Sequence, residues 1–263
     1  MALRLPALAL LVLAASGPAS AQISTDRPGL GYSPSVVPRG AVQVEAGLPQ
    51  AARERDEVRA LAVAGPTVVT VSAYSFPVLL RYGLSDAVEL RLGSSAYDVV
   101  DVAVDPPVDG ADRTEGSAGL DLIEVGAKVQ LATNGPVVAV LPSVRVPTVE
   151  YLDWGLDART VAGWTLTDRL GLTTVLGASY TDDDPDGRLS AEAVASVGLS
   201  LADAVSVYGE VAAYPQRGAT PVLAGGGLLV LVSPRVQLDA SFDLGVTDRA
   251  PDLLFGAGAS VRL

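Results

Sequence analysis

Polar and apolar residues alternate along several stretches of this sequence, and this period of two is the feature that most limits what the chain can fold into. In LSAEAVASVGLSL (189–201) one set of alternate residues is wholly apolar, whereas the other set carries serine and Glu192. VQLDASFDLGV (236–246) and IEVGAKVQL (123–131) alternate in the same way. Because successive side chains of a β-strand point to opposite faces, each stretch predicts a strand with one apolar and one polar face.

The same period recurs along the chain and predicts about twelve strands. They are expected near residues 40–49, 66–83, 87–98, 119–132, 136–147, 156–167, 170–181, 188–201, 204–214, 221–232, 235–246 and 253–263. Most of them reach the ~9–11 residues with which a tilted strand crosses a bilayer. A soluble β-sandwich alternates too, but its apolar faces pack on a second sheet rather than on lipid.

The connections between these strands alternate between short turns and long polar segments. The long segments are 50–65, 99–118, 148–155, 182–187, 215–220 and 247–252. Short turns at one rim and long loops at the other are typical of an outer-membrane barrel, whose short turns lie in the periplasm. The sequence therefore predicts an all-β fold, an antiparallel transmembrane β-barrel of about twelve strands with both termini in the periplasm.

Three of the short turns have nearly the same sequence: GLSDAVEL (83–90), TLTDRLGL (165–172) and SLADAVSV (200–207). We expect all three at the same rim. Short polar side chains readily bond to turn amides, so we expect Asp86, Asp168 and Asp203 to accept hydrogen bonds there and to help to fix the register of the strands.

The first residues have the pattern of a cleaved signal peptide. Residues 1–21 contain one arginine, an apolar run and the small-residue site ASA (19–21). We expect 22–39 to form an N-terminal periplasmic lead and 40–263 to form the barrel, in the outer membrane of a Gram-negative-type bacterium. Within the lead, TDRP (25–28) is open to two interpretations, a plug or a segment that caps the barrel bottom, and the cap is favoured.

The absence of two residue types excludes several classes of chemistry. The sequence has no histidine and no cysteine, so a Ser-His-Asp triad, disulfides, and zinc or haem sites of the usual kinds are excluded. We therefore expect no enzymatic activity and no cofactor. With 18 Lys and Arg against 30 Asp and Glu, the chain is acidic, which argues against a nucleic-acid partner.

Strand parity also assigns charged residues to the inner face of the barrel. The residues expected to line the lumen are Glu89, Arg91, Glu124, Lys128, Arg145, Asp157, Arg159, Glu192, Glu210, Asp239, Asp243 and Arg262. Both signs of charge are interleaved. The set predicts either a polar conduit whose charges select a solute, or a salt-bridge network that fills a narrow barrel, and the sequence leaves both open.

One acidic loop resembles the start of a calcium-binding loop. Asp182, Asp184 and Asp186 have the D-x-D-x-D spacing, but the position for the bidentate acid is Ala193, and the flanks predict strands instead of helices. They are weak calcium candidates, and a solvated loop is the favoured interpretation. No metal site is expected. The Asp-rich segment 98–112 is interpreted in the same way.

Several segments resemble one bacterial family. STDRPGLGYSPSVVPRGAVQVEAGL (24–48), LSDAVELRLGSS (84–95) and the ending RVQLDASFDLGVTDRAPDLLFGAGASVRL (235–263) resemble outer-membrane β-barrels of the family labelled "putative MetA pathway of phenol degradation". The resemblance implies a porin-like transporter for a small solute, hydrophobic or aromatic, with outer-membrane lipid and the barrel-assembly machinery as partners. The alternative is a closed structural or surface-contact barrel without transport. The family supplies no catalytic residues, and the oligomeric state stays open.

Overall fold

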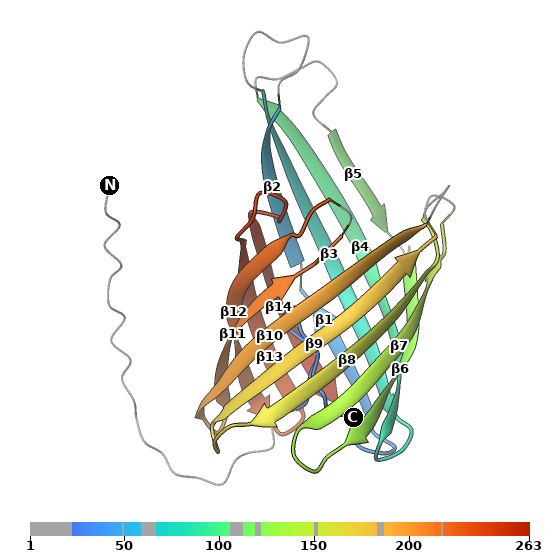
Figure 1. Cartoon of the computed structure of the whole chain (residues 1–263), viewed down its shortest axis with the longest axis vertical. Coiled ribbons are helices and arrows are strands. Elements are labelled where there is room, and N and C mark those ends of the chain that lie inside the picture. Colours follow the sequence, from blue (N-terminus) through green and yellow to red (C-terminus); the bar gives the residue numbers. More distant parts are fainter. Residues whose placement is uncertain are drawn as a thin grey trace, which may run out of the picture.

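The alternating segments form one antiparallel sheet whose two edges meet, so that the sheet closes into a barrel (Figure 1). This computed structural model describes residues 23–48, 50–58, 67–105, 113–118, 122–149, 152–182, 187–216 and 218–263. Its strands are β1 (Val42–Gly47), β2 (Gln50–Val58), β3 (Thr67–Gly83), β4 (Val88–Asp105), β5 (Arg113–Ala118), β6 (Leu122–Ala132), β7 (Val137–Pro147), β8 (Gly155–Thr165), β9 (Leu170–Thr181), β10 (Arg188–Ala202), β11 (Val205–Ala213), β12 (Val222–Ser233), β13 (Val236–Gly245) and β14 (Leu253–Arg262).

Two positions in the barrel are each occupied by two consecutive strands. β1 and β2 both pair with β3 on one side and with β14 on the other, and β5 and β6 both pair with β4. Counting each of these pairs once gives 14 − 2 = 12 positions around the barrel. The predicted fold class, an antiparallel closed barrel of twelve strands, is confirmed.

The strands β3 and β4 extend beyond the rest of the barrel (Figure 1). β2, the end of β4 and β5 lie in the segments 50–65 and 99–118, which we predicted as loops. Because of Asp101 and Asp105, we predicted the second segment as an acidic loop. Valines at positions 100, 102 and 104 alternate with these aspartates, however. β-Branched valines favour a strand, and both carboxyl-bearing residues are exposed, so neither charge has to be buried.

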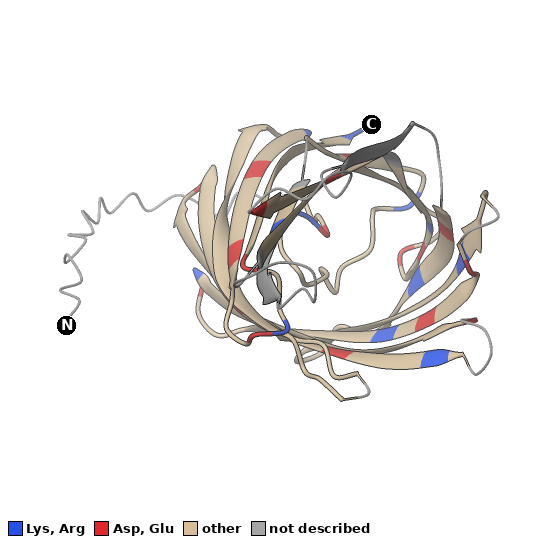
Figure 2. Cartoon of the chain, turned by 90° about the horizontal axis from the view of Figure 1, so that it is seen from above, with Lys and Arg blue, Asp and Glu red and all other residues tan. Residues whose placement is uncertain are grey.

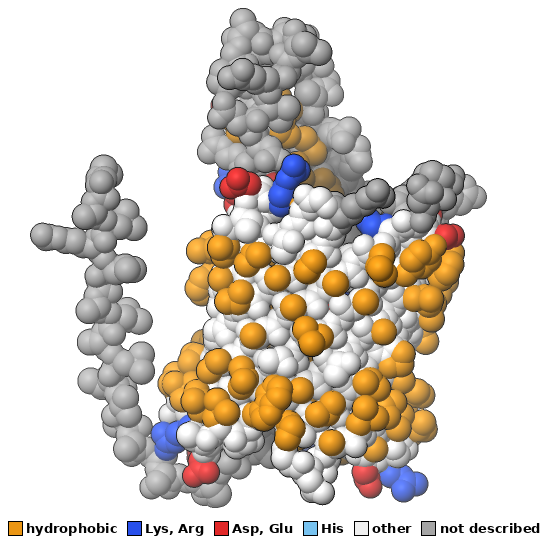
Figure 3. Space-filling model, viewed as in Figure 1, with side chains coloured by type: hydrophobic (Ala, Val, Ile, Leu, Met, Phe, Trp, Pro, Cys, Tyr) orange, Lys and Arg blue, Asp and Glu red, His pale blue; other side chains and the backbone are white. Residues whose placement is uncertain are grey.

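The outer and inner faces of the barrel differ sharply in polarity. Figure 3 shows hydrophobic side chains spread over the outside, between charged residues at the two rims. Leu176 and Phe242 are 66% and 53% exposed on this outer face, whereas Glu89 and Lys128 are fully buried inside. An apolar outer band around a polar interior is the arrangement of a transmembrane β-barrel. No helix in the described part of the chain has the length and apolarity that a membrane-spanning helix needs.

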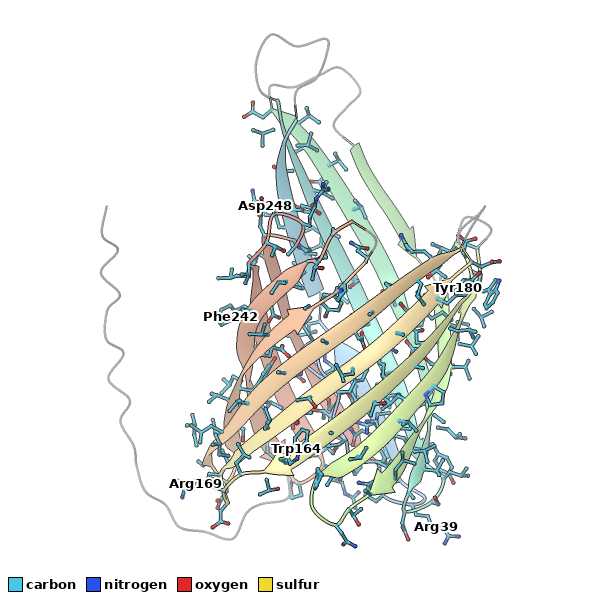
Figure 4. The ribbon with its side chains drawn as sticks, viewed as in Figure 1. Arg39, Trp164, Arg169, Tyr180, Phe242 and Asp248 are labelled. Carbon is cyan, nitrogen blue, oxygen red and sulfur yellow. The ribbon has the colours of Figure 1, made fainter. Side chains whose placement is uncertain are left out.

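The three similar turns lie at the rim that also holds the C-terminus, as predicted, and Figure 4 labels Arg169 there. Their amide hydrogen bonds differ from the prediction. The hydroxyl of Ser85 accepts from the amide two residues on, at 3.3 Å, and the hydroxyl of Thr167 accepts from the amide three residues on, at 3.1 Å. In these two turns the hydroxyl before the Asp therefore takes the role that we had assigned to Asp86 and Asp168, whereas in the third turn Ala202 precedes Asp203 and carries no hydroxyl.

Substitutions at Leu176 and in the turn should differ in cost. Leu176→Arg places a charge against lipid near the middle of β9 and should lower the unfolding free energy by about 2–4 kcal/mol. Thr167→Ala removes the hydroxyl that accepts from the amides of Arg169 and Leu170 and should cost about 0.5–1.5 kcal/mol, and Asp168→Ala should cost less than Thr167→Ala. Urea titrations in lipid vesicles measure all three. A larger loss for Asp168→Ala than for Leu176→Arg would mean that the outer face is wrongly assigned.

Candidate functional site

Residues 23–38, here called the plug segment, lie inside the barrel, and Figure 2 shows chain within the ring of strands. The side chain of Asp26 contacts β4 and β6, and that of Arg27 contacts β13 and β14. The backbone amide of Leu30 reaches β11. We had favoured residues 22–39 as a lead below the barrel. Residues 23–37 instead occupy the lumen, where Asp26 and Arg27 find partners, and only the end of the segment, with the exposed Arg39, lies at the rim.

Charged side chains of the plug segment and of four strands form a buried group, here called the anchor cluster: Asp26, Glu45, Arg81, Glu89, Arg91 and Lys128. The Nζ atom of Lys128 lies 2.9 Å from one carboxylate oxygen of Asp26, and Arg91 donates to the other. Arg81 donates from two nitrogens to Glu89, at 2.8 Å each. The third nitrogen of Arg81 donates to Glu45 at 2.7 Å.

The anchor cluster is neutral overall, because three cations face three carboxylates. Charges removed from water are tolerated only with such partners. Burial on its own would raise the pKa of Asp26, but the charges of Arg81, Lys128 and Arg91 outweigh it and hold this pKa well below its usual range. Asp26 therefore stays ionised at neutral pH, and a full charge holds the plug segment to the wall.

Arg27 makes the second attachment of the plug segment. Its guanidinium donates to the carbonyl oxygen of Ala257 at 2.8 Å and lies 3.3 Å from a carboxylate oxygen of Asp239. Gly258 leaves the space for this guanidinium, because a Cβ atom at that position would lie 2.5 Å from its Nη2 atom. Adjacent residues of the plug segment are thus tied to different sectors of the barrel wall.

The wall formed by β7 to β11 is apolar where it faces the plug segment. This apolar wall consists of buried, inward-facing residues: Ala139, Leu141, Val161, Val175, Val194 and Ala212. Leu30 and Tyr32 of the plug segment pack against it. The guanidinium of Arg159 lies over the Tyr32 ring, 5.1 Å from its centroid. Charge pairs hold one side of the plug segment, and apolar contact holds the other.

Eight of the twelve charged residues predicted for the lumen fall into two groups. Three belong to the anchor cluster: Glu89, Arg91 and Lys128. Five form a second group on β6 to β10, here called the side group: Glu124, Arg145, Asp157, Arg159 and Glu192. In the side group, Arg145 lies 2.8 Å from Asp157 and Arg159 lies 2.6 Å from Glu192.

The other four predicted residues lie apart from these groups. Asp239 pairs with the arginine of the plug segment. Glu210 accepts from a backbone amide of the plug segment, with its oxygens at 3.0 and 3.1 Å. Arg262 donates to a glutamine of β1 at 3.0 Å. Asp243 lines a cavity, and its Oδ1 atom has no hydrogen-bond partner.

Several of the strongest contacts in the lumen were missing from the prediction. Asp26 and Arg27 stood in the segment assigned to the periplasmic lead, and Glu45 and Arg81 were not assigned to the inner face. Strand parity could have found the last two, because each alternates with apolar residues along its strand. No local pattern signals that TDRP (25–28) enters the barrel, since its partners are contributed by distant strands.

The weak calcium candidates lie partly beyond what the structure describes. Asp184 and Asp186 are outside the described residues. Asp182 accepts hydrogen bonds from Trp154 Nε1 at 2.8 Å and from the Tyr180 hydroxyl at 3.2 Å. Within the described residues, no three or more acidic side chains gather in a way that could hold a metal ion.

Among the described residues, two cavities border the plug segment. The upper cavity, toward the long-loop rim, has a volume of about 390 Å³ and is lined by residues 28–30 and by Ala73, Val100 and Asp243 among others. The lower cavity has a volume of about 220 Å³ and lies between the plug segment and β9 to β12. The upper cavity has the size of a site for a small molecule, about 300–1,000 Å³, and the lower cavity is smaller than that.

Comparison with known proteins agrees with this architecture. The sequence profile of the family described as "Putative MetA-pathway of phenol degradation" matches residues 25–263. An outer membrane channel from Pseudomonas putida F1 is 13% identical, with a TM-score of 0.62, and the match covers 90% of this chain and 99% of that one. The NanC porin is 8% identical, with a TM-score of 0.57 and coverage of 84% and 100%. The KdgM porin is 7% identical, with a TM-score of 0.53 and coverage of 84% and 98%.

At such identities the likeness shows the fold, which is that of a bacterial outer-membrane β-barrel. Among curated proteins, no match to the chain is found.

Arg81 should contribute far more to stability than an arginine at the edge of the lumen. Arg81→Met leaves the buried carboxylates of Glu45 and Glu89 short of a partner and should lower the unfolding free energy by about 3–5 kcal/mol. The control, Arg262→Met, removes one hydrogen bond to Gln43 and should cost about 1 kcal/mol. Urea titrations in lipid vesicles measure both. Equal losses would contradict a role for the anchor cluster in stability.

Proposed function

We propose that this chain, which belongs to the family described as "Putative MetA-pathway of phenol degradation", is an outer-membrane channel for a small solute, with the plug segment as its constriction. The observation that carries the proposal is that the plug segment fills only part of the lumen and leaves a cavity on each of two sides. The plug segment is attached at Asp26 and Arg27 and leaves cavities of about 390 and 220 Å³ beside it. Protein interiors are close-packed by default, so unfilled space within a barrel favours passage over a purely structural role.

Apolar surface inside the barrel favours a solute with a hydrophobic or aromatic body. Val100 lines the upper cavity, and Val102 and Val104 continue along the same face of β4 where this strand extends beyond the rest of the barrel. Lower in the barrel, Leu30 and Tyr32 meet the apolar wall. Apolar contact is worth about 25 cal/mol per Å² of surface removed from water, so this route would stabilise an apolar body along its length.

A closed structural or surface-contact barrel is the second candidate function. The observation in its favour is the anchor cluster, because its pairing and burial would hold the plug segment in place permanently. The two candidate functions differ in whether the plug segment ever moves far enough to open a path through the barrel.

The remaining parts of the proposal follow from the outer face and the composition. The apolar outer band would contact outer-membrane lipid, and the barrel-assembly machinery would insert the chain after export directed by residues 1–21. A chain without histidine or cysteine offers few groups for acid–base or nucleophilic chemistry, so the proposal includes no enzymatic activity.

Loosening the plug segment should raise the conductance of the barrel. Asp26→Asn removes the charge shared by Arg91 and Lys128, and deletion of residues 23–36 removes the constriction itself. In planar bilayers, the refolded mature chain should show small openings. Asp26→Asn should open more often, and the deletion should conduct several-fold more. Asp86→Asn, at an exposed turn, is the matched control and should behave as wild type.

Two results would favour the structural alternative. One is a correctly folded wild-type barrel without any open state, together with an equally silent deletion variant. The other is wild-type conductance in both lumen variants. Heat-modifiable gel mobility establishes that each variant is folded before its conductance is compared.

A further inference from the structure

We propose that the upper cavity is a binding site for a small organic ammonium compound, and that Asp243 holds its charged group while the cavity walls hold an apolar body. The inference rests on the proposed function, because the solute has to reach this cavity from outside. It narrows the solute from any apolar molecule to a cationic amphiphile.

The first observation is the state of the Asp243 side chain. Asp243 is 2% exposed and lines the upper cavity, and its Oδ1 atom has no hydrogen-bond partner. Within the described residues, Asp243 takes part in no ion pair. Burying a carboxylate without a cationic partner costs free energy. A ligand that carries a cation would supply this partner.

A second buried carboxylate, that of Glu210, adds negative charge to the lumen and has no cationic partner of its own among the described residues. Its oxygens accept from the backbone amide of Leu30 at 3.0 and 3.1 Å. In the part of the chain that the structure describes, the luminal arginine and lysine side chains are engaged in the anchor cluster, in the side group, at Asp239 and, for Arg262, at Gln43. The sector around the upper cavity is therefore electronegative, which attracts a cation.

The glycine opposite Asp243 makes room for this carboxylate. Gly225 pairs with Asp243 across β12 and β13. A Cβ atom at position 225 would lie within contact distance of the Asp243 carboxylate. Because position 225 carries no side chain, the Asp243 carboxylate has space on the luminal face of the wall.

The lining of the upper cavity decides between a metal ion and an organic cation. Most of its walls are apolar, with Ala52, Ala73, Val100 and Leu254 among the lining residues. A hard metal ion needs about six oxygen ligands, and one carboxylate with a few hydroxyls falls short of that. An ammonium group needs only a carboxylate and hydrogen-bond acceptors, and the volume of about 390 Å³ leaves space for an apolar body.

The test measures binding instead of passage, with benzylammonium as the probe. Isothermal titration of the refolded mature chain in detergent should show binding. Asp243→Asn should weaken it at least about tenfold, which corresponds to about 1.4 kcal/mol. Asp243→Glu keeps the charge and should retain more affinity than Asp243→Asn. The matched control, Asp157→Asn, removes a buried luminal carboxylate of the side group and should change affinity less than about twofold.

Two further probes separate the parts of the inference. Benzyl alcohol, the neutral analogue, should bind more weakly than benzylammonium and should not respond to Asp243→Asn. Ammonium chloride should compete poorly, because it lacks the apolar body. An equal loss for benzyl alcohol would overturn the role of charge, and full competition by ammonium would overturn the role of the walls.

The inference as a whole is overturned if folded wild type does not bind benzylammonium, or if Asp243→Asn binds it equally well. This outcome is distinguishable from a failure of the proposed function. A barrel that binds the probe through Asp243 but never conducts would retain the site and lose the channel. A barrel that conducts without any effect of Asp243 on binding would retain the channel and lose this site.

Discussion

In a closed barrel one face of every strand points into the lumen, and a buried charge on that face needs a partner of opposite charge within the lumen. The wall of the anchor cluster carries three cations, Arg81, Arg91 and Lys128, but only two carboxylates, Glu45 and Glu89. Asp26 of the plug segment supplies the third. Without it, the wall would hold an unbalanced positive charge in a place that water reaches poorly. The position of the plug segment therefore follows from charge balance in the lumen.

Once Asp26 is fixed, the rest of the lumen is divided. Arg27 takes the neighbouring sector at Asp239, and Leu30 and Tyr32 cover the apolar wall. The upper cavity is lined by β13 and β14, and among the described residues its Asp243 takes part in no ion pair. Charge pairs at Asp26 and Arg27 hold the segment to two sectors of the wall, so under the proposed function its movement as a constriction would take place where Leu30 and Tyr32 make apolar contact.

Most of the barrel could be predicted from the sequence, because each strand carries its own two-residue period and each face has one environment. Prediction failed where the decisive partner is distant. Asp26 lies far along the chain from Lys128, and no local pattern of TDRP (25–28) encodes that contact. The extension of β4 was missed for a different reason, since aspartates such as Asp101 resemble a loop until the alternating valines are read as a face. Strand parity could also have assigned Glu45 and Arg81 to the inner face, but our prediction did not include them.

The position of the plug segment is the central claim, and a cross-link between this segment and the wall tests it most directly. The chain has no cysteine, so Pro34→Cys together with Gly163→Cys introduces one pair. A Cβ atom at position 163 would lie 3.7 Å from that of Pro34, close to the mean separation of about 3.8 Å in disulfides. Mass spectrometry of the oxidised barrel in lipid should find this disulfide in nearly all molecules, and a control pair of Pro34→Cys with Asp86→Cys should stay reduced. Free thiols in both pairs would place residues 23–38 outside the lumen and contradict the account.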